Sequence, residues 1–335
     1  MYWPEELKNY NDIKEKFSNA NILLGNGFSI NFSDTFRYKK LYDFFIKSCS
    51  DASKKLFKEL DTDNFENVLE SIETTELVCK ALNINYNKFE EHKIEIKKGL
   101  IDSIGNIHPK ITDPNWLEIK NKLNLVSSQF NEFENIFTTN YDILLYYIIL
   151  ALEDENPIFG DYFAHSDGEY TYFDESNLSR ERHIYYLHGA LFLFEQNFDT
   201  CKIKAKNSLL NDISKEIENN NYPIFVSEGT SNSKLKAIKS NDYLTFCLKQ
   251  FKKKINSDGR LVIFGQSLSD QDQHLVDIID ENCKKIAISI NSDHCPTIGA
   301  LKQKKSEFQA KFKRVEEIFF YDSKTLFNFW TLPFF

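Results

Sequence analysis

Short apolar runs bounded by turn residues recur along the chain and predict buried strands. Strands of a parallel sheet are covered on both faces, so they are apolar throughout instead of alternating with polar positions. Helical patterns lie between most of the runs, and this alternation predicts an α/β fold with one doubly wound, mainly parallel, Rossmann-like sheet. The seven predicted strands are Ile22–Leu24, Ile136–Thr138, Ile184–Leu187, Ile224–Val226, Leu261–Phe264, Ile286–Ile290 and Ile318–Tyr321. The predicted helices include Tyr141–Leu152, Ser233–Lys254 and Asp272–Cys283.

Two intervals depart from this alternation. About 110 residues separate the first predicted strand from the second, and residues 39–125 among them are helical and charged in character. We expect a helical insert subdomain at 39–125, within a single domain that spans residues 1–335. The interval from Glu153 to His183 is rich in Asp, Glu, Tyr and Phe and has little helical period. It predicts an irregular excursion or a hairpin.

The first predicted strand runs directly into Gly25-Asn26-Gly27-Phe28-Ser29. Glycine permits unusual backbone angles and a close approach of backbone to a ligand. A helix that begins near Ser29 or the following residue would direct its N–H groups and its positive dipole end toward a diphosphate. A plain tight turn accounts for the same glycines, and both interpretations stay open on this segment alone.

The second and third predicted strands also end in polar residues. The second is followed by Thr139, Asn140, Tyr141 and Asp142, which either face a ligand crevice at the carboxyl end of the sheet or cap the next helix. The third ends in His188 followed by glycine, where a substrate has room to approach an imidazole that is usable as an acid or a base. A structural histidine is the alternative. The other histidines show no shared metal-ligand spacing.

Polar residues follow the fifth and sixth predicted strands as well. Gly265-Gln266-Ser267 comes after the fifth and Asn291 after the sixth, and each is compatible with a turn or a helix cap. Because the carboxyl ends of parallel strands meet at one edge of a sheet, we expect all of these clusters to converge.

Composition narrows the possible functions. A net charge of −9 and a pI near 5.4 argue against direct nucleic-acid binding, which depends mainly on Lys and Arg. The six cysteines form no C-x-x-C pair, which argues against a disulfide framework and a cysteine-rich structural zinc site. No apolar run approaches the roughly 18 residues of a membrane span, and the N-terminal residues lack the pattern of a secretory signal. We expect a cytoplasmic protein without membrane contact.

The order of these motifs resembles the sirtuin (silent information regulator) family, and more closely its zinc-free bacterial sirtuin-like members. The Gly25–Ser29 segment is similar to the family's Gly-Ala-Gly-x-Ser phosphate loop, and Thr139–Asp142 to its Gln-Asn-x-Asp segment, with Thr in place of Gln. Leu187–Gly189 matches the catalytic His-Gly, Gly265–Leu268 resembles Gly-Thr-Ser-Leu, and Ile290-Asn291 resembles the later Ile-Asn pair. The five matches follow the family order from residue 22 to residue 291.

The resemblance implies a substrate and a set of roles. It implies that nicotinamide adenine dinucleotide (NAD) binds here. Asn140 would bind the ribose or the attacking water, Asp142 would recognise the nicotinamide carboxamide, and His188 would deprotonate a ribose hydroxyl or the water. The implied NAD-binding residues are Gly25, Asn26, Gly27, Phe28, Ser29, Thr139, Gly265, Ser267 and Asn291.

One departure from the family changes the expected activity. Protein-deacetylating sirtuins carry two cysteine pairs on a zinc ribbon after the His-Gly strand, whereas residues 190–223 contain only Cys201. The resemblance therefore implies an NAD hydrolase that needs no metal and serves as a toxic effector of anti-phage defence by abortive infection. Such effectors are held inactive until triggered, so we expect a regulatory or sensor protein encoded nearby, or self-assembly into an oligomer.

Two other functions stay open at the level of sequence. ADP-ribosyl transfer or deacylation would cleave the same bond and deliver ADP-ribose to another acceptor. A non-catalytic NAD sensor would bind without turnover, but it would have no need for the set of Asn140, Asp142 and His188. The sequence pattern does not encode the trigger, the partner, the oligomeric state or the range of nucleotides accepted.

Overall fold

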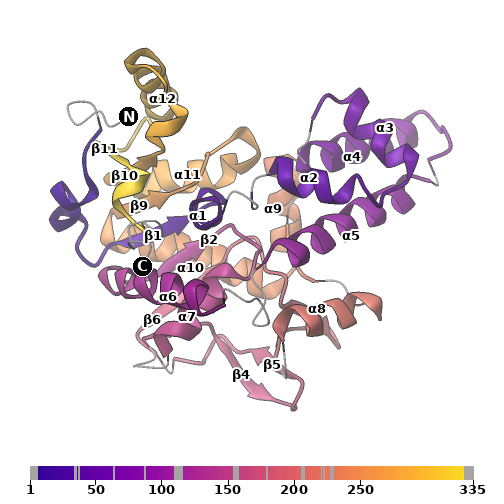
Figure 1. Cartoon of the computed structure of the whole chain (residues 1–335), viewed down its shortest axis with the longest axis horizontal. Coiled ribbons are helices and arrows are strands. Elements are labelled where there is room, and N and C mark those ends of the chain that lie inside the picture. Colours follow the sequence, from indigo (N-terminus) through magenta and orange to yellow (C-terminus); the bar gives the residue numbers. More distant parts are fainter. Residues whose placement is uncertain are drawn as a thin grey trace.

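The computed structural model contains a seven-stranded parallel sheet (Figure 1). It describes residues 7–33, 36, 38–62, 65–86, 88–108, 116–153, 158–178, 180–204, 208–219, 221, 223–226 and 230–327. Every pair of neighbouring strands runs parallel, in the order β11-β10-β9-β1-β2-β6-β3. The strands are β1 (Asn21–Leu24), β2 (Ile136–Thr138), β3 (Phe159–Gly160), β6 (Arg182–Tyr186), β9 (Arg260–Phe264), β10 (Lys285–Ile290) and β11 (Glu317–Asp322). The expected α/β class and mainly parallel sheet are thus confirmed.

The strand order reverses at β1, which is the centre of the sheet. The chain passes from β1 to β2 and β6 on one side, and β9, β10 and β11 extend the sheet on the other side. Leu24 lies opposite Thr138 of β2 and Phe264 of β9, so the three central strands end at one level. Open α/β sheets bind ligands at such a reversal, beyond the carboxyl ends of the strands.

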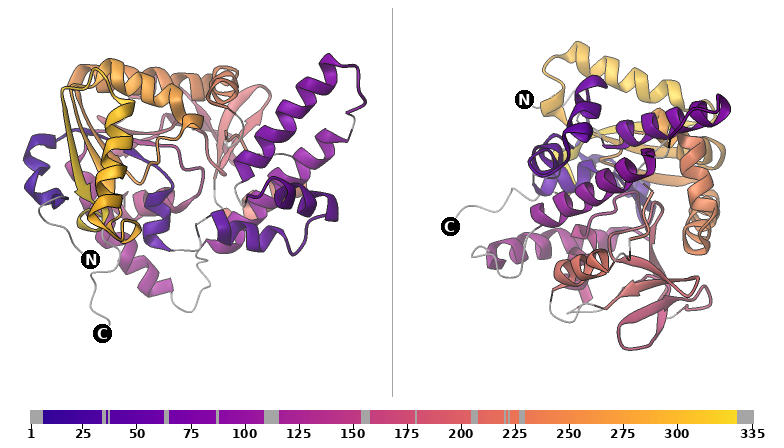
Figure 2. Two further views of the ribbon diagram at one scale, coloured as in Figure 1. Left: turned by 90° about the horizontal axis from the view of Figure 1, so that it is seen from above. Right: turned by 90° about the vertical axis from the view of Figure 1, so that its right-hand side faces the viewer.

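Helices cover both faces of the sheet (Figure 2). On one face lie α10 (Asp242–Asp258) and α11 (Gln273–Asn282), and on the other lie α1 (Gly27–Phe32), α6 (Trp116–Ser127) and α7 (Leu144–Glu153). Phe251 of α10 packs edge-on against Phe137 of β2, with ring centroids 4.9 Å apart. Of the described helices, none is both long and apolar enough to cross a bilayer.

Helix α10 shows how local sequence sets the boundaries of these elements. The Asn241 side chain accepts a hydrogen bond from the N–H of Leu244 (3.0 Å), and the helix ends at Gly259 with φ of 69°. This cap divides the predicted helix Ser233–Lys254 into α9 (Ser231–Lys239) and α10. The predicted single helix was therefore wrong, because a capping asparagine interrupts an otherwise continuous helical pattern.

Between β1 and β2, all regular secondary structure that the structure describes is helical, as the sequence predicts. Its helices α2 (Tyr38–Phe45), α3 (Asp51–Glu59), α4 (Phe65–Ala81) and α5 (Phe89–Ile107) project beyond the sheet, and α6 packs on α7 instead (Figures 1 and 2). Phe45, Phe57 and Phe65 pack together at ring-centroid distances of 5.2 to 5.5 Å. Residues 109–115 of the predicted insert lie outside the described residues.

A second sheet was not expected from the sequence. It is antiparallel, with the order β4-β5-β8-β7, and its strands are β4 (Phe163–Ser166), β5 (Tyr170–Phe173), β7 (Leu193–Gln196) and β8 (Asp199–Ile203). Asp167 closes the turn between β4 and β5, because its Oδ1 accepts from the N–H groups of Glu169 (2.9 Å) and Tyr170 (2.8 Å). For the interval predicted as an irregular excursion or a hairpin, the hairpin is confirmed: the interval contains β3 and the β4–β5 hairpin, whose register shifts between Ala164 and Ser166.

One predicted strand was wrong. Ile224–Val226 makes only an isolated antiparallel bridge, between Phe225 and Gly189, and β3 supplies the seventh strand of the sheet instead. The N–H groups of Ile224 and Val226 donate to the carbonyls of Leu193 (2.7 Å) and His188 (2.8 Å). This short apolar segment packs against the loop that follows β6, with Val226 buried and Ile224 and Phe225 half-buried, and has no place in the sheet. The remaining helices are α8 (Leu209–Glu218) and α12 (Ile298–Lys311).

Candidate functional site

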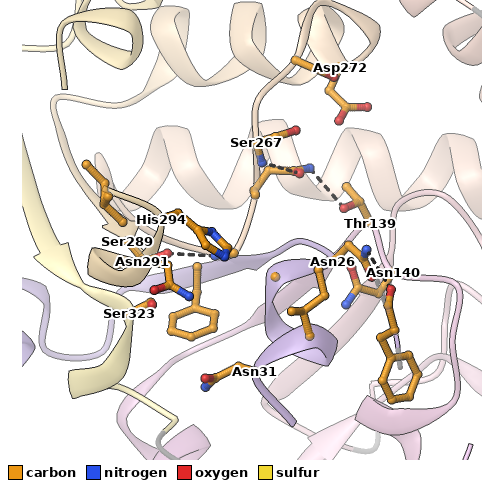
Figure 3. Close-up of a pocket in the computed structure, with 18 of the residues that line it drawn as sticks. Asn26, Asn31, Thr139, Asn140, Ser267, Asp272, Ser289, Asn291, His294 and Ser323 are labelled. Atoms are coloured by element: carbon orange, nitrogen blue, oxygen red, sulfur yellow. Dashed lines mark hydrogen bonds between the residues drawn. The ribbon is translucent and has the colours of Figure 1, made fainter. Parts of the chain in front are cut away.

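A pocket of about 1560 Å³ lies beyond the carboxyl ends of β1, β2, β9, β10 and β11. Figure 3 shows Thr139 and Asn140 on one side of it, Asn291 and Ser323 on the other, and Asn26 between them. The expected convergence of polar segments at one edge of the sheet is what the structure shows. Each segment reaches this edge because the strand before it is parallel to its neighbours.

The glycine loop after β1 packs directly on the loop after β9. The N–H of Gly27 donates to the carbonyl of Gly265 (2.8 Å), and Gly265 has φ of +67°. A Cβ built on Gly27 would lie 2.6 Å from the Cα of Gly265, and one on Gly25 would lie 2.6 Å from the Cα of Gln266. Loop packing alone therefore requires these glycines.

Helix α1 begins at Gly27, earlier than predicted. Asn26 already has helical backbone angles, and its carbonyl accepts from the N–H of Ile30 (3.0 Å). The N–H groups of Gly27 and Phe28 donate to protein carbonyls, of Gly265 and Gly25 respectively. These two groups are thus engaged within the protein and do not face a diphosphate, contrary to the expectation for a free helix N-terminus.

Ser29, Asn140 and Asp142 form a hydrogen-bonded network, which we call the serine network. The Ser29 hydroxyl donates to Oδ2 of Asp142 (2.6 Å) and accepts from Nδ2 of Asn140 (3.0 Å). Oδ1 of Asp142 accepts from the N–H of Leu144 (2.9 Å), at the start of α7, so the capping role considered for Asp142 is also present. All three residues of the network are buried. Oδ1 of Asn140 has no hydrogen-bond partner within the described residues and remains able to accept from a ligand.

His188 is buried beside the serine network at the same end of the pocket. Its Nε2 lies 3.4 Å from Nε2 of His274. Burial, together with the positive charge of Lys234 and the neighbouring His274, holds the pKa of His188 well below its usual range. Burial also lowers the pKa of His274 to about 4. Both imidazoles are therefore neutral near pH 7.

The opposite end of the pocket is more open. Ser267 is exposed, and Oδ1 of Asn291 accepts from the N–H of Asp293 (2.9 Å). Asp293 forms an ion pair with Lys324 (2.5 Å), and this hydrogen bond lowers the pKa of Asp293. Most polar contacts here join residues close in sequence or lie at the surface.

The structure places the residues singled out in the sequence in two groups. Three of them do not line the pocket: Gly25 is covered by the β9 loop, Phe28 packs against Phe264 and Phe327 in the core, and Ser29 lies behind Asn140. The residues that line it are Asn26, Gly27, Thr139, Asn140, Asp142, His188, Gly265, Ser267 and Asn291.

Sequence reasoning missed several lining or adjacent residues. Gln266, in the loop after β9, contacts the segment after β2, because its Nε2 donates to Oγ1 of Thr139 (3.1 Å). Ser289 of β10 contacts the same loop, because its Oγ accepts from the N–H of Gly265 (2.9 Å). Gln266 lies between Gly265 and Ser267, so the sequence pattern that singled out these two neighbours could also have found it. His274 is 86 residues from His188, and no local signal in the sequence connects them.

The described residues contain no group of three or more His, Cys, Asp or Glu side chains placed to hold a metal ion. All six cysteines are buried as free thiols, and Cys201 lies in β8. The described residues that line the pocket carry amide, carboxylate, imidazole and hydroxyl groups, together with the ammonium groups of three lysines and the thiol of Cys295.

Comparison with known proteins identifies the family. No curated protein matches the chain. Residues 22–330, which include every segment that lines the pocket, match the family model of a domain of unknown function, DUF4917, and the chain therefore belongs to the DUF4917 family.

Proposed function

We propose that this protein hydrolyses NAD at the bond between nicotinamide and ribose, releasing nicotinamide and ADP-ribose. The observation that carries the proposal is the arrangement at one end of the pocket. There the buried serine network and a buried neutral histidine, His188, face a pocket of about 1560 Å³. Ordinary small-molecule sites have roughly 300–1000 Å³, so this pocket has room for an extended dinucleotide.

The two ends of the pocket suit the two halves of NAD. We place the nicotinamide ribose beside Asn140 and His188, where the polar groups are buried. The adenosine would lie across the β9 and β10 ends, beside Ser267 and Asn291. The diphosphate would then pass over the joined glycine loops at Gly27 and Gly265, whose lack of side chains permits a close approach.

The chemistry does not require a proton to be given to the leaving group. When the bond between the anomeric carbon and the nicotinamide nitrogen breaks, its electron pair neutralises the cationic ring. The enzyme has to stabilise an oxocarbenium-like centre and to place a water, whose oxygen bonds to the anomeric carbon with loss of one proton. This scheme assigns no step to a metal.

Each buried group then has a role. Oδ1 of Asn140 accepts from a ribose hydroxyl or from the attacking water. Asp142 recognises the carboxamide, since a carboxylate oxygen accepts more than one hydrogen bond. His188 meets the ribose hydroxyls or the water through its Nδ1, because its Nε2 lies against His274. Ser29 holds Asn140 and Asp142 in a fixed relation.

The order of the motifs supports the finer part of the proposal. It resembles that of zinc-free bacterial sirtuin-like proteins, so we propose a cytoplasmic effector of anti-phage defence. We propose that its activity is switched on by a partner encoded nearby or by assembly into an oligomer.

The test is product analysis with the full chain. The purified protein, alone and mixed with the proteins of its genomic neighbours, is incubated with NAD, and an Asn140→Ala chain serves as the matched control. Equal amounts of nicotinamide and free ADP-ribose are expected. Nicotinamide without free ADP-ribose would indicate transfer to another acceptor. NAD binding without any nicotinamide under all conditions would contradict the proposal in favour of a sensor.

A further inference from the structure

A second set of polar side chains lies on the side of His188 where its Nε2 meets His274. Ser231 and Lys234 come from α9, Asp272 from the turn before α11, and His274 from the first turn of α11. His274 is 6% exposed and Lys234 only 2%. Nζ of Lys234 donates to Oδ1 of Asp272 (3.2 Å), so a buried cation in this set is paired. We call Ser231, His274 and His188 the imidazole chain.

The proposed direction of the imidazole chain starts at Ser231. Oγ of Ser231 accepts from the backbone N–H of His274 (2.8 Å), and its one remaining side-chain contact in the described residues is Nδ1 of His274 (3.0 Å). The hydroxyl keeps one proton to donate, and we assign this proton to the contact with Nδ1. His274 then carries its own proton on Nε2.

The same reasoning extends one step further along the chain. The proton on Nε2 of His274 faces Nε2 of His188 across 3.4 Å, so Nε2 of His188 accepts. A neutral imidazole has one protonated and one unprotonated nitrogen, which places the proton of His188 on Nδ1. Nδ1 has no hydrogen-bond partner within the described residues, and because His188 lines the pocket, we assign Nδ1 to the contact with the bound substrate.

We infer that His274, fixed by Ser231, is a positioning residue that makes His188 a hydrogen-bond donor to the bound substrate through Nδ1, not a general base. The inference rests on the proposed NAD hydrolysis and names the role of one residue in it. The acceptor is a ribose hydroxyl oxygen, and the bond fixes the sugar relative to Asn140.

The proposed chemistry is compatible with a donor at this position. Nicotinamide departs as a neutral ring, and the water that bonds to the anomeric carbon becomes cationic. It then loses its proton to solvent without a strong base. Burial, with the positive charge of Lys234 and the neighbouring His274, keeps the pKa of His188 well below its usual range, and a weak base of this kind contributes little to proton abstraction near neutral pH.

The decisive variants differ in which ring nitrogen they can replace. The amide nitrogen of His188→Asn lies near the position of Nδ1, whereas that of His188→Gln reaches toward the position of Nε2. Neither amide can act as a base. We expect His188→Asn to retain nicotinamide release within about tenfold of wild type, while His188→Ala and His188→Gln lose about 100-fold or more. Melting temperatures measured on the same samples separate these effects from unfolding.

A spectroscopic measurement tests the imidazole chain without turnover. In the full chain labelled with ¹⁵N-histidine, long-range ¹H–¹⁵N spectra distinguish the two neutral tautomers, and the His188 signals are assigned by their loss in His188→Asn. We expect protonated Nδ1 on His188 at pH 7.5. His274→Ala should shift these signals toward a mixture of tautomers, while His274→Gln, which keeps a donor, should preserve them.

Two outcomes would overturn the inference. One is a wild-type His188 protonated on Nε2, and the other is a well-folded His188→Asn protein as inactive as His188→Ala. A wild-type chain that binds NAD but releases no nicotinamide would defeat the proposed hydrolysis alone. In that case the tautomer of His188 and the order of NAD affinities among the three variants at this position still decide the inference.

Discussion

The two ends of the pocket are built in different ways. At the β2 and β6 end, Asn140 and His188 are buried and hydrogen-bonded to partners far away in the sequence, at Ser29 and His274. At the β9 and β10 end, Ser267 is exposed and Asn291 bonds to a residue two positions away. The first end is held in a fixed geometry by the core of the protein, whereas the second follows from local turns.

This difference separates positioning from affinity. Groups held in place before a ligand arrives contribute most where geometry decides the rate. Exposed groups in local turns contribute hydrogen bonds that compete with water. We therefore expect substitutions at the first end to affect chemistry and those at the second end to affect binding.

The largest effect is expected for Asn140→Ala. It removes the acceptor that the proposed function assigns to the ribose or the water, and also a hydrogen bond to Ser29. Nicotinamide release under activating conditions should fall about 10²–10⁴-fold, the range for a positioned catalytic group. Asn282→Ala, at the far end of α11, is the control and should leave release unchanged. An equal loss in Asn282→Ala would show that the effect of Asn140→Ala is not specific to the pocket.

Gly27→Ala tests the contact between the two glycine loops, which lies between the two ends of the pocket. The new Cβ would lie 2.6 Å from the Cα of Gly265, and neither backbone can move aside without disturbing its strand. Overpacking of this kind costs about 1–3 kcal/mol in the free energy of unfolding, measurable by denaturant titration. Gly105→Ala in α5 is matched to it, because nothing lies within 4 Å of its Cβ. That change should be neutral or should stabilise the helix by up to about 1 kcal/mol.

The pH dependence of stability tests the buried, neutral histidines. Desolvation lowers the pKa of His183 and of His274 to about 4. The unfolded chain takes up protons near pH 6.5 and the folded chain does not, so stability is full above pH 6.5 and is lost as pH falls toward 4. In that window each histidine lowers the free energy of unfolding by up to about 1.4 kcal/mol for each unit by which the pH falls.

His183→Phe provides the comparison for the histidine prediction. Among the described residues, neither ring nitrogen of His183 has a hydrogen-bond partner, and its ring stacks on Tyr162 with centroids 4.2 Å apart. Because His183 does not line the pocket, the variant should unfold less steeply with acid and keep its NAD affinity. A steeper acid dependence in His183→Phe would contradict the assignment.

The smallest effects are expected at the open end. Ser267→Ala and Asn291→Ala should each weaken NAD binding by about 1 kcal/mol, roughly fivefold, with little change in release at saturating NAD. Asn291→Asp is a useful companion, because it keeps the acceptor for the N–H of Asp293 while removing the donor. Isothermal titration measures the affinities. Unchanged affinity in both alanine variants would mean that the adenosine lies elsewhere.

The sequence predicted those parts of the molecule that depend on burial along a single segment. Strands such as β1 and β10 are apolar because both faces are covered, and this pattern is visible without partners. β3 has only two residues and carries no pattern, while Ile224–Val226 is apolar because it packs, partly buried, against a loop. An apolar run reports burial, and a place in a sheet requires partners that a single segment does not show.

The candidate site also has one part that the sequence predicts and another that depends on tertiary packing. Asn140 and His188 follow predicted strands, so their position at the sheet edge follows from topology. The positions of the partners that orient Asn140 and His188 do not follow from topology. His274 meets His188 only because α11 packs beside α9, and Ser29 meets Asp142 only because α1 lies next to the β2 end. Such pairs depend on tertiary packing and have no periodic signal.

The contact between the glycine loops has a consequence for evolution within the DUF4917 family. Gly25, Gly27 and Gly265 are required because two backbones touch, whatever the pocket contains. Members that have lost the chemistry should therefore still keep these glycines, and their retention identifies the fold alone. Under the proposed function, selection for turnover retains Asn140 and His188, because neither takes part in the contact between the glycine loops. An inventory of the family should therefore use these two positions to separate active members from inactive ones.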